Sequence, residues 1–176
     1  MAGNTAKFAY SSDGITWADV SLTIPVGTWN DILYSPELSL YVAVGTNACM
    51  TSIDGAGWTT QTIPTGTWNS VAWSPGLGLL VAVSSATNYV ATSPDGITWT
   101  ARTATAGTWL GVAWLDELSL FVAIGTNNSM VSADGINWTP ATTVVSGAWN
   151  GIAWSPELAL AVAVASSGTN KIMTVP

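Results

Sequence analysis

The chain has 176 residues and a formal net charge of −7, and only 7% of its residues are charged. Ten carboxylates stand against three basic residues, so the chain cannot neutralise a row of phosphates, and nucleic acid is excluded as a partner. With one cysteine and no histidine, the composition offers no internal disulfide, no metal-ligand spacing and no His-activated nucleophile.

The apolar segments are as short as single strands. The longest of them, at residues 158–165, is far too short to cross a bilayer, so we expect no membrane partner. The first seven residues lack a basic start followed by an apolar stretch, which indicates no signal peptide in this chain. A surface made of Ser, Thr, Asn and Gly is typical of secreted and virion proteins. We therefore expect a single domain over residues 1–176 on a virion or an extracellular surface.

One unit of about 40 residues recurs four times along the chain. Each unit begins with an extended segment that starts at a Trp, as at residues 68–73, and stops at a turn signal such as Ser-Pro-Gly. A second strand, rich in branched aliphatic residues, ends at a Thr-Asn turn. A third strand runs into the motif Ser-x-Asp-Gly-x-x-Trp, and a fourth leaves from that Trp. Asp-Gly between two extended segments is a strong hairpin signal.

Four antiparallel strands per unit, without helical periodicity, predict an all-β fold, a β-propeller of four-stranded antiparallel blades. The repeats cover residues 27–65, 66–106, 107–146, and 147–176 together with 5–26. We therefore expect the two chain ends to close one blade together. One strand is then surplus, because residues 7–11 and 171–176 both suit the third place in that blade.

A surplus strand leaves an unpaired edge, and such an edge invites pairing with another chain. Two assemblies stay open from the sequence. One is a monomeric ring of four blades. The other is a homo-oligomer, in which two chains join through the surplus strand into a larger ring.

Strict alternation in the first strand of a blade would place Asn69, Val71 and Trp73 on one face and Trp68 and Ser70 on the other. We expect the small residues of that second face to lie where neighbouring blades approach closely. The Trp that ends each first strand is then expected to fill the gap between blades. These residues are Trp73, Trp114 and Trp154, with Tyr34 in the remaining repeat.

An aspartate occupies the same place in each Asp-Gly turn. The four residues are Asp13, Asp54, Asp95 and Asp134. Their equivalence indicates a structural role, in which a carboxylate oxygen accepts backbone N–H groups of a tight turn. The motif resembles the Asp-box, the bacterial-neuraminidase repeat of sialidase-type propellers. Gly follows Asp directly here, so the chain is more similar to the degenerate repeats of phage tail-fibre and bacterial surface proteins.

That resemblance implies a fold rather than an activity. Sialidases of this family clamp the substrate carboxylate with three arginines, whereas this chain has only Arg102. The turn aspartates are equivalent to one another, and no other pair of acids stands out as a catalytic pair. We therefore expect no enzymatic activity, no catalytic residue, no metal and no other cofactor.

An aromatic residue beside an amide recurs where first strands begin, as Trp29-Asn30, Trp68-Asn69 and Trp149-Asn150. Strand direction places the Thr-Asn turns on the same rim, which adds Asn47, Asn88, Asn127 and Asn170. Sugars are bound by stacking on aromatic rings and by hydrogen bonds to amides. These residues are therefore the predicted glycan-binding site. Packing of the Trp residues in the core is the alternative, and the third repeat carries Leu110 in place of Asn.

Two functions stay open from the sequence. The first is a non-enzymatic, lectin-like module on a virion or cell surface. The second is a structural or assembly scaffold, such as a phage fibre element or an engineered repeat protein, with no small ligand. The closeness of the repeats fits either several weak sites acting together or no binding at all.

Overall fold

The structure is a computed structural model that describes residues 8–20, 28–86, 89–141, 146–168 and 172–175. Over these residues the chain forms strands and turns only. No described segment is a helix long and apolar enough to cross a membrane.

Three sheets contain four antiparallel strands each, in sequence order, as the repeats predict. The first blade consists of β3 (Trp29–Ser35), β4 (Leu40–Gly45), β5 (Ala48–Ser52) and β6 (Thr59–Gln61). The second consists of β7 (Trp68–Ser74), β8 (Leu79–Ser84), β9 (Val90–Ser93) and β10 (Thr100–Arg102). The third consists of β11 (Trp109–Leu115), β12 (Leu120–Gly125), β13 (Ser129–Ser132) and β14 (Thr139–Pro140).

The two chain ends form separate sheets. The fourth blade has three strands, β15 (Ala148–Ser155), β16 (Leu160–Ser167) and β17 (Ile172–Val175). The N-terminal hairpin consists of β1 (Phe8–Tyr10) and β2 (Ala18–Val20), which pair only with each other. The expected blade closed by both ends is therefore not formed within the described residues. Because β17 follows β16 closely in the chain, it takes the third place at a low cost of loop closure.

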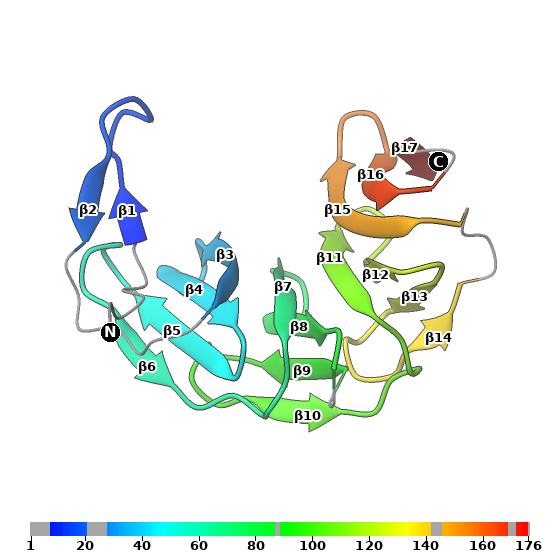
Figure 1. Ribbon diagram of the computed structural model, residues 1–176, viewed down its shortest axis with the longest axis horizontal. Helices are drawn as coiled ribbons and strands as arrows, with labels where there is room; N and C mark the ends of the chain where they lie inside the picture. The colour runs from blue at the N-terminus through cyan, green and yellow to red at the C-terminus, as the bar shows by residue number, and fades with distance from the viewer. Residues whose placement is uncertain (1–7, 21–27, 87–88, 142–145, 169–171, 176) are drawn as a thin grey trace.

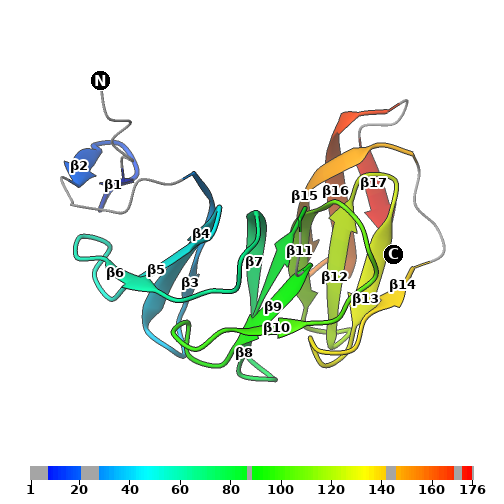
Figure 2. The same ribbon diagram turned by 60° about the horizontal axis from the view of Figure 1, so that its bottom comes forward.

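The blades stand side by side in an open arc (Figures 1 and 2). The first strands β3, β7, β11 and β15 line the concave side, and each contacts the next. The fourth strands β6, β10 and β14 lie at the periphery. The N-terminal hairpin and the fourth blade lie at opposite ends of the arc in both views.

The hydrophobic core consists of layers between adjacent blades. Between the first two blades, Val42 and Val44 pack in one buried cluster with Val71, Leu80 and Trp99. An equivalent cluster joins the second and third blades, and a smaller one joins the third and fourth. Each blade thus buries its apolar faces against its neighbours, as expected for blades that are not stable alone.

The Asp-Gly turns explain why each third strand reverses into a fourth. In the second blade, Asp95 Oδ1 accepts the backbone N–H groups of Ile97 and Thr98 at 2.8 and 2.7 Å, and also the hydroxyl of Ser93 at 3.0 Å. Gly96 has a φ of 74°, which a residue with a Cβ adopts at a cost. The same bonds recur at the other three turns.

These hydrogen bonds lower the pKa of all four turn carboxyls. Hydrogen bonds from backbone N–H groups are the largest cause at Asp13, Asp54 and Asp134. At Asp95, burial raises the pKa, but the bonds from Thr98 and Ile97 outweigh it and the net direction is downward. The aspartate carboxylates accept hydrogen bonds from their own turns, which is the structural role that the sequence predicts.

Candidate functional site

The inner strands carry the same irregularity near their first residue. In β3, β7, β11 and β15 the pairing register shifts just after the leading Trp, so one extra residue is left without a cross-strand partner. A bulge of this kind changes the direction of the side chains around it. The extra residues are Asn30, Asn69, Leu110 and Asn150.

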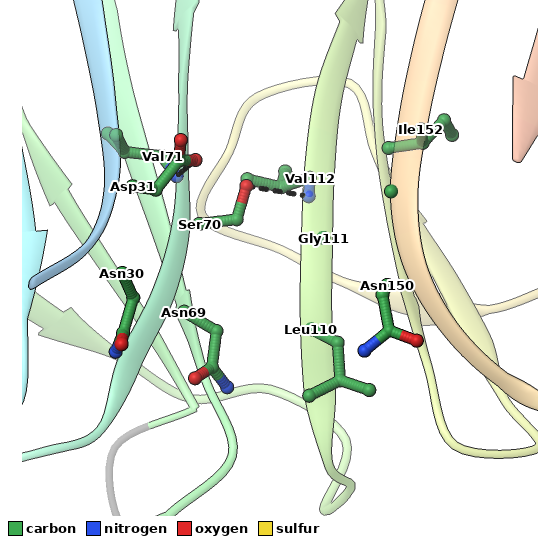
Figure 3. Close-up of a pocket in the computed structure, with 11 residues that line it drawn as sticks. Asn30, Asp31, Asn69, Ser70, Val71, Leu110, Gly111, Val112, Asn150 and Ile152 are labelled. Atoms are coloured by element: carbon green, nitrogen blue, oxygen red, sulfur yellow. Dashed lines mark hydrogen bonds between the residues drawn. The ribbon is translucent and has the colours of Figure 1, made fainter. Parts of the chain in front are cut away.

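These four residues form one row along the concave side of the arc (Figure 3). Together with the residues that follow them, they line a cavity of about 360 Å³ that spans all four inner strands. Asp31 and Ser70 make a second row beside the first, with Gly111 at the equivalent place in β11. We call this cavity the inner groove. The polar side chains that line it are three amides, one hydroxyl and one carboxylate.

The first row ties the first blade to the second and the second blade to the third. Asn30 Nδ2 donates to the backbone carbonyl of Trp68 at 2.8 Å, and Asn69 Nδ2 donates to the carbonyl of Trp109 at 2.7 Å. These two amides are therefore partly used in holding the blades together. Their carbonyl oxygens face the groove side with no bond among those described.

The second row makes a matching set of bonds. Asp31 Oδ2 accepts the backbone N–H of Val71 at 2.9 Å, and Ser70 Oγ accepts the N–H of Val112 at 3.3 Å. The other carboxylate oxygen of Asp31 accepts the N–H of Ile32 at 2.8 Å. The only ionised group of the described groove lining is thus used in backbone contacts, and the serine hydroxyl keeps its proton available for donation.

Asp31 and Ser70 are residues that the sequence reasoning did not assign to the site. Asp31 falls outside the conserved spacing of the turn aspartates, and Ser70 reads as a small packing residue. The available signal was positional. The second residue after the Trp of a first strand is a hydrogen-bond acceptor in the first two blades and glycine in the other two, at Gly111 and Gly151.

The predicted stacking role of the Trp residues is wrong for Trp68 and Trp149. Both are 0% exposed, so neither ring has a free face for a sugar. Trp68 also donates its Nε1 hydrogen to the carbonyl of Pro64 at 2.9 Å, which fixes the ring in the core. Trp29 is half-buried and packs edge-on against Phe8, with the ring centroids 5.5 Å apart. The alternative of core packing is the one that the structure favours.

The Thr-Asn turns are also occupied by structural contacts. Asn47 and Asn127 have positive φ values of 54° and 58°, as a turn asparagine can adopt. Asn47 Oδ1 accepts the backbone N–H of Gly66 at 2.9 Å, and Asn127 Oδ1 accepts that of Gly147 at 2.8 Å. Each turn is thereby fixed to the loop that leads into the next blade. The predicted residues Asn88 and Asn170 lie outside the described residues.

Asn150 differs from the other asparagines of the row. Its Oδ1 accepts the N–H of Ser166 at 3.2 Å within its own blade. Its Nδ2 donates to none of the described residues, and the side chain is exposed. Asn150 therefore offers the groove a free amide donor.

Groups suited to catalysis are not gathered in the groove. Cys49 is buried on β5 of the first blade, and burial raises the pKa of its thiol to about 12. Glu37 and Glu117 accept the Nε1 hydrogens of Trp73 and Trp154 at 2.7 and 2.5 Å. Among the described residues, no three potential ligands lie close enough together to hold a metal ion.

No protein-family model matches the sequence, and no curated protein matches it. Solved structures do resemble the fold. Virginiamycin B lyase from Staphylococcus aureus has a TM-score of 0.74 at 11% identity, over 97% of this chain and 62% of its own. A chain of the nidogen/laminin complex gives 0.72 at 15% identity, over 90% and 64%. YCF48 bound to D1 peptide gives 0.64 at 19%, over 85% and 50%.

These structures are β-propeller proteins, and with the arrangement of the sheets they confirm an all-β propeller fold. At such low identities the likeness shows the fold alone. This chain spans only about half to two thirds of the length of these propellers. Because they include an enzyme as well as members of complexes, the fold does not choose between catalysis and binding. Membership of the Asp-box repeats stays a prediction.

Proposed function

We propose that the protein is a non-catalytic binding module that takes glycans in its inner groove. The observation that carries the proposal is the lining of that groove, in which amides and a hydroxyl from neighbouring blades converge on one cavity of about 360 Å³. A ligand there would meet the carbonyl oxygens of Asn30 and Asn69, the hydroxyl of Ser70 and the free amide donor of Asn150.

The ligand is neutral and polar. The net charge of −7 disfavours polyanions, and the one carboxylate in the groove already accepts two backbone hydrogen bonds. The groove offers little apolar surface for side chains of a peptide, since its apolar side chains are only Val71, Leu110, Val112 and Ile152. Sugar hydroxyls both donate and accept, which matches paired carboxamide and hydroxyl groups. With no exposed aromatic face in the row, affinity per site should be weak, roughly millimolar.

Such weak sites act usefully when many are presented together. The low content of charged residues, with Ser, Thr, Asn and Gly supplying the polar surface, supports a place on a virion or an extracellular surface. We include this location in the proposal.

A scaffold without a small ligand is the second candidate. It is favoured by the bonds of Asn30 and Asn69 to the next blade, because these explain both asparagines by assembly alone. The two candidates differ in what they require of Leu110, which lies in the groove row but has a side chain that cannot hydrogen-bond to the next blade.

The test is a glycan array probed with the protein displayed on multivalent beads. Replacing Leu110 with Arg would fill the groove without removing an inter-blade bond. Leu77→Arg is the matched control, because Leu77 is 43% exposed on a hairpin away from the groove. The proposal expects glycan binding by the native protein and by Leu77→Arg, and its loss in Leu110→Arg. Absence of binding across the array, or equal binding by both variants, would favour the scaffold.

A further inference from the structure

Adjacent blades repeat one apolar contact on the concave half of their interface. A branched residue on the second strand of each blade packs with a branched residue on the first strand of the next. The pairs are Val44 with Val71, Val83 with Val112, and Ile124 with Ile152. The second-strand members are at most 1% exposed.

The two ends of the arc carry the two halves of a fourth such pair. Val164 is the equivalent residue on β16 and is 50% exposed. Ile32 is the equivalent residue on β3 and is 51% exposed. Beside Ile32 lies an open hollow of about 280 Å³, also lined by Phe8 and Trp29. Apolar surface that is buried at every internal interface is therefore uncovered at both ends.

A polar contact between adjacent blades also has its donor position at one end of the arc and its acceptor position at the other. Trp73 and Trp154 each donate to a glutamate of the preceding blade, Glu37 and Glu117 respectively. The residues at the corresponding end positions are Tyr34, which is 47% exposed, and Glu157. Their hydroxyl and carboxylate can form the same kind of bond across a fourth interface.

The amide bonds of the groove follow the same rule. Asn30 and Asn69 donate to the Trp carbonyl of the following blade. At the end of the row, Asn150 has a free Nδ2. The carbonyl that would accept it by analogy belongs to Trp29, at the other end of the arc.

The outer half of the interface has a vacant place as well. Gly96 lies against Leu40 and Val42 of the first blade, and an added Cβ would come within 3.1 and 3.2 Å of them. Gly135 lies in the same way against the second blade. On the third blade, the corresponding Leu120 and Val122 face an apolar cavity of about 140 Å³.

The matching turn is in the N-terminal hairpin. Gly14 has no atom of another residue within 4 Å of its would-be Cβ, and Trp17 is 64% exposed. Trp99, its counterpart in the second blade, is only 9% exposed. The hairpin thus presents the turn and the indole that the described residues of the fourth blade lack.

We propose that two copies of this chain join head to tail into one closed ring. The β15–β16 face of each copy packs against β3 of the other, and the N-terminal hairpin supplies the outer half of the shared blade. Two equivalent contacts of this kind close a ring under twofold symmetry. The ring contains eight blades, three whole blades from each chain and two that the chains share.

A second copy fits this place better than the chain's own other end. Figures 1 and 2 show the two ends far apart along an open arc. The match to virginiamycin B lyase covers 97% of this chain but only 62% of the lyase, so the arc has the curvature of a ring with more than four blades. Closing on itself would require every internal interface to change its angle.

The shared blade also decides between the two candidate third strands. The hairpin already contacts the first blade, because Phe8 lies 4.8 Å from Trp58 between ring centroids. Only one of β1 and β17 fits beside β16. Since β1 leads to the turn that carries Trp17, which the outer half of the shared blade needs, β1 of the partner copy displaces β17 in the ring.

Sedimentation of the 176-residue protein over a range of concentrations tests this proposal. The expected mass is twice the 18.2 kDa of one chain. Ile32→Arg and Val164→Arg should each shift it to the mass of one chain, because each puts a charge into one half of the interface. Ile97→Arg should keep the two-chain mass, since Ile97 is similarly exposed, at 52%, but lies on an internal turn. Circular dichroism verifies that each variant is folded.

Two further measurements sharpen the outcome. A mixture of Ile32→Arg and Val164→Arg retains one intact interface and should recover a two-chain species. Removal of residues 171–176 should leave the two-chain mass intact, since β1 takes that place. A one-chain mass for the native protein, a mass above two chains, or a two-chain mass in both arginine variants would overturn the proposal.

Discussion

Removal of the Trp99 side chain should destabilise the protein more than removal of any half-exposed indole. Trp99 is 9% exposed, packs in the cluster between the first two blades, and donates its Nε1 hydrogen to the carbonyl of Gly96 at 3.0 Å. Truncating a large buried aromatic residue to Ala costs about 3–5 kcal/mol. Domains of this kind are stable by only about 5–15 kcal/mol, so Trp99→Ala should remove a large part of the stability.

The assay is urea unfolding followed by circular dichroism, with the free energy taken from the midpoint and slope. Trp73→Ala is the matched control, because Trp73 is only half-buried and its Nε1 bond to Glu37 is exposed. We expect a loss of about 1–2 kcal/mol for the control. Equal losses in the two variants would refute the view that the core lies between blades and depends on the indole after each Asp-Gly turn.

Three other predictions follow from the same interfaces. Gly135→Ala should lower the free energy of unfolding by about 1–3 kcal/mol more than Gly55→Ala, as measured by thermal unfolding. Both glycines have φ above 70°, but an added Cβ would lie 2.9 Å from a leucine methyl at Gly135 and 3.9 Å from its nearest neighbour at Gly55. Equal costs would contradict this packing. Because the folded pKa values of the turn aspartates are lowered, the unfolded chain binds protons first on acidification, so stability should hold above about pH 5 and fall as the pH drops below 4. Asp95→Asn should weaken that dependence, and stability that stays constant down to pH 2 would contradict it. Cys49, whose buried thiol has a raised pKa, should react with a disulfide reagent at pH 8 only after unfolding, and rapid reaction of the native protein would contradict its burial.

The blade architecture could be predicted from the sequence because its signals are local and repeated. The extended segment expected at residues 68–73 is β7, which extends one residue further, to Ser74. The Asp-Gly turns depend on bonds within four residues, so the motif alone defines them. Repetition of such signals four times gave the strand order as well.

The direction of the inner side chains could not be predicted in this way. Strict alternation assigns Trp68 and Ser70 to one face, but the bulge between them breaks the alternation. As a result Trp68 is buried while Asn69, Ser70 and Val71 all line the groove. The bulge leaves one residue of β7 without a partner on β8, and a period-two pattern does not show such an insertion. The sugar-stacking role expected for the Trp residues failed for this reason.

The use of the asparagines could not be predicted either. The partners of Asn30 and Asn69 are backbone carbonyls 38 and 40 residues further along the chain. Backbone groups have no residue type that a sequence pattern can detect. The split of the chain ends into two sheets likewise depends on which of two suitable segments pairs with β16, and the repeat pattern fits both.

The most direct test of the account is an image of the assembled protein at low resolution, by electron microscopy of particles or by solution scattering. Our central claim is that the two ends of the arc are the two halves of one blade interface. It predicts a closed ring of eight blades with a central channel, built from two chains. A population of open four-blade arcs, or a closed ring of four blades with the mass of one chain, would contradict it.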